Sequence, residues 1–140
     1  MVNPTGGKIR NDKAGVGLFG ASRGGRRHRG VDLLCVPGQA VLAPISGVYR
    51  RIAYPYSGDK KYLGVCLQNS KCEIKLFYVR PFISVGKKIK AGDVIGFAQD
   101  ISEKYGKDMK PHIHMEISNI DPLWFLEVAG ENQHCASYDG

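Results

Sequence analysis

The sequence has no apolar stretch long enough to cross a membrane, since one of its longest apolar runs, Val31–Val36, is short and interrupted by Asp32. Its opening residues 1–7 lack the apolar core of a secretory signal peptide, so a secreted form is expected to be a mature one. With 43% hydrophobic and 24% charged residues, the chain is neither disordered nor collagen-like. We therefore expect one soluble globular domain of 140 residues.

Acidic residues are scarce: 13 Asp and Glu oppose 20 Lys and Arg, giving a net charge of +7. Such a balance favours polyanionic partners, among them heparin-like glycans, acidic protein surfaces and anionic cell walls. The positive charge is densest in a glycine-spaced cluster, here called the arginine cluster, formed by Arg23, Arg26, Arg27 and Arg29. This cluster is either an ordinary solvated surface or a salt-sensitive glycan-binding site.

The C-x-x-C spacing of zinc fingers is also missing, because no two of the four cysteines have just two residues between them. An even number of cysteines suits one or two disulfides in an oxidising compartment, with free thiols as the alternative. A hairpin turning at residues 68–70 would set Cys66 opposite Cys72, which leaves Cys35 and Cys135 as a second candidate pair.

Short apolar runs separated by Gly and Pro predict an all-β, mainly antiparallel fold with long loops and at most a short helix. No repeat or linker divides the chain, so we expect a single domain over residues 1–140, with a core at about 17–126 and an N-terminal loop and a C-terminal tail outside it. The expected strands span residues 16–19, 31–36, 40–44, 47–52, 62–67, 72–79 and 111–117, with a further strand after a turn at 91–93. Helical turns are expected within 100–110 and at 121–126.

The strand at residues 111–117 carries two histidines in an H-x-H pattern. Because side chains alternate along a strand, His112, His114 and Glu116 face one way and the apolar residues between them face the other. Two imidazoles about 7 Å apart on one face can share a metal or divide the work of ligand and catalyst. An H-x-H pair taken alone is more commonly an incidental surface or core pair.

A third ligand must come from elsewhere in the chain, and the candidates are His28, His134 and the carboxylates. His28 precedes Asp32 in an H-x-x-x-D spacing, at the point where a glycine-rich loop becomes a strand. Two imidazole nitrogens and one carboxylate oxygen leave a fourth position open, as in catalytic zinc sites, where bound water is acidified toward a pKa of about 7.

Four blocks of the sequence, in order and spacing, resemble the lysostaphin-type (LytM-like) zinc metallopeptidases: residues 28–33, 38–48, 85–96 and 111–117. The resemblance covers roughly residues 17–126. It implies that Zn²⁺ is bound by His28, Asp32 and His114 and that His112 occupies a catalytic position.

The resemblance departs from the family pattern at one residue. Peptidases of this family use a further His two residues after a Tyr, whereas this chain has Arg80 two residues after Tyr78. Imidazole exchanges protons near pH 7, but a guanidinium stays charged and only donates hydrogen bonds. The substitution therefore favours a protein without peptidase activity.

The Val31–Cys35 run, the segment at residues 77–81 and the basic charge resemble a secreted vertebrate branch of this family that keeps the zinc site and acts in immune signalling. This branch implies a chemotactic, cytokine-like zinc protein that binds cell-surface receptors and heparin-like glycans, without nucleic acid or membrane insertion. No Cys precedes His28 or directly follows Glu116, so the branch's disulfide scheme is not carried over. The alternative is an active zinc endopeptidase that cleaves peptidoglycan cross-bridges or glycine-rich peptides.

Three tyrosines, Tyr54, Tyr56 and Tyr62, surround a polar loop in the middle of the chain. They are expected either to form an aromatic contact surface or to serve ordinary packing.

Overall fold

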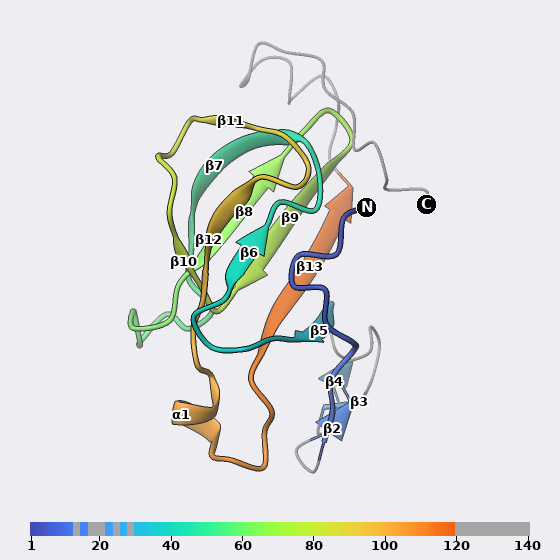
Figure 1. Ribbon diagram of the computed structural model, residues 1–140, viewed down its shortest axis with the longest axis vertical. Helices are drawn as coiled ribbons and strands as arrows, with labels where there is room; N and C mark the ends of the chain where they lie inside the picture. The colour runs from blue at the N-terminus through green and yellow to red at the C-terminus, as the bar shows by residue number, and fades with distance from the viewer. Residues whose placement is uncertain (13–14, 17–21, 24–25, 28–29, 120–140) are drawn as a thin grey trace.

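Two antiparallel sheets packed against each other form the body of the protein in a computed structural model, which describes residues 1–12, 15–16, 22–23, 26–27 and 30–119 (Figure 1). The larger sheet has the strand order β11 (Lys88–Ile89), β7 (Gly47–Ala53), β8 (Gly64–Gln68), β9 (Cys72–Phe77), β13 (His112–Asn119) and β5 (Val31–Leu34). The smaller sheet has the order β10 (Val79–Pro81), β12 (Val94–Ala98) and β6 (Ala40–Leu42).

Two short hairpins and one helical turn complete the described elements. The hairpins pair β1 (Asn11–Asp12) with β2 (Gly15–Val16) and β3 (Ser22–Arg23) with β4 (Arg26–Arg27), and the helical turn is α1 (Ser102–Tyr105). Every strand pair is antiparallel, which confirms the predicted fold class. None of the described helices is long and apolar enough to cross a membrane.

The core lies between the two sheets. Val41 and Ile95 of the smaller sheet and Leu67, Ile74 and Leu76 of the larger one are all fully buried and belong to one cluster. Strand β9 alternates buried and half-buried residues along its whole length, as the period-2 pattern of the sequence predicts. Because the core is built from alternate residues of each strand, the register of the large sheet is strongly specified.

Strand β13 runs between β9 and β5, and its register determines what the histidines face (Figure 1). His114 is paired with Asp32 on one side and with Phe77 on the other. Gly30 lets β5 begin this close to β13, since a Cβ on Gly30 would lie 2.0 Å from the carbonyl oxygen of Met115.

The cysteine prediction is wrong for the hairpin of β8 and β9. The register pairs Gln68 with Glu73, which places Cys66 opposite Lys75 rather than opposite Cys72. Cys35, Cys66 and Cys72 are all free thiols, and Cys135 lies outside the described residues. Burial, reinforced by the nearby Glu73 charge, raises the pKa of the Cys66 thiol to about 11.

The N-terminal segment, predicted as a loop outside the core, lies along the free edge of β5. The amide of Leu34 donates to the carbonyl oxygen of Lys8 at 2.8 Å, Ile9 forms a bridge with Leu33, and Arg10 is buried. The domain boundary itself stays a prediction, because residues 17–21 and the helical turn expected at 121–126 lie outside the described residues.

Candidate functional site

Asp32 and His114 meet at the end of the large sheet where β13 begins. They are direct cross-strand partners on β5 and β13, so their side chains leave the same face of the sheet. His114 Nδ1 lies 2.7 Å from Asp32 Oδ1, which is hydrogen-bond distance. Two of the three predicted zinc ligands are thus brought into direct contact, although 82 residues separate them in sequence.

The His114 ring is fixed from two further sides. Its Nε2 lies 3.4 Å from Glu116 Oε1, which confirms that the two side chains share a face. The Phe77 ring stacks on it with centroids 5.9 Å apart and an interplanar angle of 17°. The imidazole is therefore held in one orientation, as expected of a metal ligand positioned by its surroundings.

His112 is nearly fully buried, at 3% exposure. Its Nδ1 donates to the carbonyl oxygen of Lys110 at 2.8 Å, which leaves Nε2 with the lone pair in the neutral ring, 3.7 Å from Asp32 Oδ2. Burial lowers the pKa of His112 and outweighs the opposing effect of the Asp32 charge. The ring is held neutral at physiological pH, with a proton-accepting nitrogen facing the carboxylate.

Arg10 is the site residue that sequence reasoning missed. Its side chain is only 2% exposed, and its Nε donates to Asp32 Oδ2 at 3.0 Å. Its backbone N–H also donates to the carbonyl oxygen of Asp32 at 2.8 Å, so Arg10 is tied to Asp32 twice. The two carboxylate oxygens are thereby divided, with Oδ2 on Arg10 and Oδ1 on His114. The only signal in the sequence was a basic residue in a segment that has no apolar periodicity.

A group of tyrosines borders His112. Tyr78 has a left-handed backbone with φ of 68°, and its ring packs edge-on against His112 at 5.6 Å. The Tyr56 hydroxyl hydrogen-bonds to the Tyr78 hydroxyl at 3.0 Å and to the Tyr105 hydroxyl at 2.6 Å. Burial raises the pKa of Tyr78 to about 12, so its phenol is protonated at neutral pH.

Tyr54, Tyr56 and Tyr62 do not share one environment. Tyr62 is buried and packs edge-on against Tyr56 and Tyr78, as the packing interpretation expects. Tyr54 is 46% exposed, with the Lys60 ammonium 5.8 Å from its ring centroid.

Arg80 lies at a neighbouring groove. This cavity of about 220 Å³ is lined by Arg80 together with Tyr62, Phe97, Asp100 and Glu103, among others, and by none of the three residues Asp32, His112 and His114. Tyr78, two residues earlier, provides the side chain that contacts His112.

Two of the three predicted zinc ligands lie among the described residues. Among the described residues no group of three or more His, Cys, Asp or Glu side chains is arranged to hold a metal ion, and the third predicted ligand, His28, lies outside them, as does His134. The carboxylate of Asp32 and the imidazole of His114 are both ligands that zinc accepts, and their donor atoms Oδ1 and Nδ1 already lie 2.7 Å apart. The residues present therefore fit zinc.

Comparison with known proteins identifies the relatives of this arrangement. The model of peptidase family M23 matches residues 26–124. Leukocyte cell-derived chemotaxin-2 from Bos taurus is 32% identical over 117 residues, covering 82% of this chain and 76% of that protein. Myeloid protein 1 from Gallus gallus is 34% identical over 131 residues, and the match covers 89% of this chain but only 39% of the longer relative.

Solved structures agree in fold. The catalytic domain of the antimicrobial peptidase lysostaphin from Staphylococcus simulans superimposes with a TM-score of 0.57 at 22% identity, covering 86% of this chain and 92% of that one. This likeness concerns the fold alone.

The pairing of Arg10 with Asp32 predicts strong energetic coupling. Replacing either residue removes this buried ion pair, so Arg10→Ala and Asp32→Asn are each expected to lower the free energy of unfolding of the metal-free protein by about 3 kcal/mol. The double variant should lose clearly less than the sum, as measured by urea denaturation after chelation. Arg51→Ala, which removes an exposed arginine, is the matched control and should change little. Additive effects within about 0.5 kcal/mol would contradict the coupling.

Proposed function

Because this chain belongs to peptidase family M23, we propose that it is a secreted zinc-binding signalling protein that keeps the family's metal site without peptidase activity. The observation that carries the metal-binding part of the proposal is the direct cross-strand contact between Asp32 and His114. The loss of peptidase activity is inferred from Arg80. The similarity to leukocyte cell-derived chemotaxin-2 supports a signalling role over a proteolytic one.

In the proposed site, zinc would be held by His28, Asp32 and His114. The ion, when bound, supplies a Lewis acid and an acidified water. The chain's own residues orient its ligands: Arg10 holds Asp32 Oδ2 so that Oδ1 faces His114, and the Phe77 ring fixes the imidazole plane.

The proposed loss of peptidase activity depends on proton transfer. His112 keeps a proton-accepting Nε2. At the position of the family's other catalytic histidine this chain has Arg80, whose guanidinium has no proton-accepting nitrogen. Arg80 also lines the groove beside Tyr62 and Glu103. A single base therefore remains where the family's peptidases use two histidines.

The competing function is an active zinc endopeptidase acting on peptidoglycan cross-bridges or other glycine-rich peptides. The geometry of His112 supports this alternative, because a buried neutral imidazole next to the carboxylate of Asp32, a proposed zinc ligand, is suited to general-base catalysis. Both candidate functions use the proposed zinc site, but only the endopeptidase would hydrolyse a peptide.

The proposed partners are a cell-surface receptor and heparin-like glycans. The arginine cluster supports the glycan part, since two of its members, Arg26 and Arg27, form β4, and β4 pairs with the strand that contains Arg23. A net charge of +7 adds long-range attraction to sulfated chains.

The zinc assignment predicts loss of metal in two variants. Asp32→Ala and His114→Ala should each retain less than about a tenth of the zinc bound by the original protein, as measured by elemental mass spectrometry. Their melting temperatures should fall, because a metal bound only by the folded state adds stability by linkage. His112→Ala, which removes a buried neighbour that is not a proposed ligand, should keep the zinc. Full zinc occupancy in both Asp32→Ala and His114→Ala would refute the ligand set.

The activity assignment predicts no hydrolysis of a pentaglycine-type peptide by the zinc-loaded protein above the rate of its His112→Ala variant. The reason is the missing second imidazole at position 80. Product formation is followed by mass spectrometry. Zinc-dependent cleavage that His112→Ala abolishes would establish the endopeptidase instead.

The glycan assignment predicts that replacing all four residues of the arginine cluster by Ser lowers the salt concentration needed for elution from immobilised heparin. A control with the same charge loss replaces four exposed basic residues elsewhere: Arg51, Lys60, Lys71 and Lys107. The control should elute close to the original protein. Equal retention of both variants would reject the arginine cluster as the binding site.

A further inference from the structure

The outer face of the small sheet exposes large apolar side chains. Phe82, Val94 and Phe97 are 65%, 37% and 38% exposed, and the rings of Phe82 and Phe97 meet edge-on with centroids 5.5 Å apart. The inner face of the same sheet is fully used, since Val41 and Ile95 are completely buried in the core. Adjacent exposed aromatic residues on a sheet face mark an interaction surface more often than isolated ones do.

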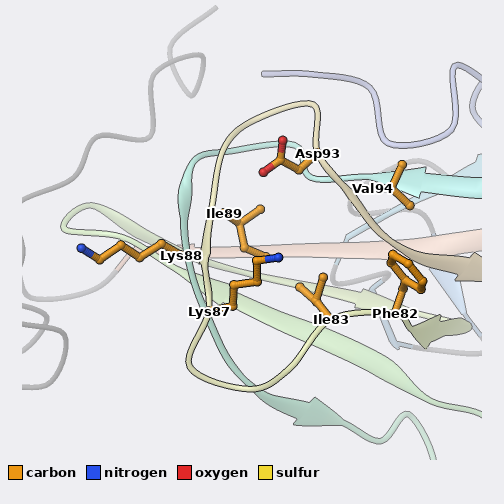
Figure 2. Close-up of a pocket in the computed structure, with 7 residues that line it drawn as sticks. All are labelled: Phe82, Ile83, Lys87, Lys88, Ile89, Asp93 and Val94. Atoms are coloured by element: carbon orange, nitrogen blue, oxygen red, sulfur yellow. The ribbon is translucent and has the colours of Figure 1, made fainter.

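A pocket opens at one end of this face. It has a volume of about 320 Å³, at the small end of ligand-site sizes, which suits one large side chain. Its apolar lining comes from Phe82, Ile83, Ile89 and Val94, and its polar lining includes Lys87 and Asp93. Figure 2 shows Lys87 reaching inward over the pocket, whereas Lys88 points away from it.

Basic side chains outnumber acidic ones in the lining of the pocket. Its charged residues are Lys87, Lys88 and a single acidic one, Asp93. The carboxylate of Asp93 already accepts the backbone N–H of Lys90 at 2.9 Å, which stabilises the turn. An incoming group with negative charge is therefore complementary to this rim.

The pocket is remote from the proposed zinc site. Its residues Lys88 and Ile89 form β11 at one edge of the large sheet, whereas Asp32 lies on β5 at the other edge. The pocket needs neither zinc nor the residues around it, so the two surfaces can be altered independently.

We propose that this pocket docks an acidic peptide segment of a protein partner, with one aromatic side chain inserted beside Phe82 and Val94 and a neighbouring carboxylate close to Lys87. A sulfated glycan would match the charge but would leave the apolar lining unused. A small aromatic acid would fill the pocket but would leave Phe97 uncovered. The inference deepens the proposed signalling function and rests on it for the existence of a partner, while binding to the pocket is measured separately.

The test uses the full chain and a fluorescein-labelled heptapeptide that has one tryptophan flanked by acidic residues on both sides. Fluorescence anisotropy should show saturable binding that weakens about tenfold or more in Phe82→Ser and in Lys87→Glu. Both side chains project from the surface and leave the core intact, which circular dichroism checks. Val36→Ser, at a residue 68% exposed in the loop after β5, and Lys107→Glu are the matched controls and should bind as the original protein does.

Several outcomes would overturn the inference. These are equal binding of a peptide with lysines in place of the acidic residues, equal loss in the two control variants, and binding of indole-3-acetate alone as tight as that of the peptide. Concentration-dependent dimerisation that Phe82→Ser abolishes would assign the face to a second copy of the chain instead. His114→Ala should bind the peptide normally, so that a failure of the zinc proposal and a failure of this one give different results.

Discussion

The buried carboxylate of Asp32 is the constraint on which the site depends. It is charged and only 3% exposed, and such a group is tolerated only when it is paired and hydrogen-bonded. Arg10 and His114 meet that requirement from opposite directions in the sequence, one from the N-terminal segment and one from β13. The N-terminal segment is thus tied to the sheet by the same interaction that orients the proposed metal ligand Asp32.

A second constraint is the point at which β9 ends. Phe77 is the last residue of the strand and stacks on His114, and the next residue, Tyr78, adopts a left-handed backbone that costs of order 1–3 kcal/mol in a non-glycine residue. Hydrogen bonds hold it there, from its N–H to the Leu63 carbonyl oxygen at 2.8 Å and from the Gln99 N–H to its own carbonyl oxygen at 2.8 Å. The turn thus places the Phe77 ring against His114 and the Tyr78 ring against His112.

The protein separates its two proposed surfaces. The proposed metal site lies where β5 and β13 meet, and its residues Asp32 and Arg10 are buried and paired. The pocket at Phe82 and Lys87 lies at the far edge of the large sheet, and it is apolar, exposed and rimmed by positive charge. In the proposed function, this separation would let a partner dock without disturbing the metal site.

Local pattern in the sequence determined much of this protein. Alternation and turn residues indicated the antiparallel strands and placed His112, His114 and Glu116 on one face, because these features depend on residues close together in the chain. The predicted zinc ligands came from the family resemblance. Only the tertiary structure decided the rest. It set Cys66 against Lys75 rather than Cys72, brought Arg10 onto Asp32 and turned Tyr78 onto His112. These contacts join segments that are distant in sequence, so the local pattern of each segment does not reveal them.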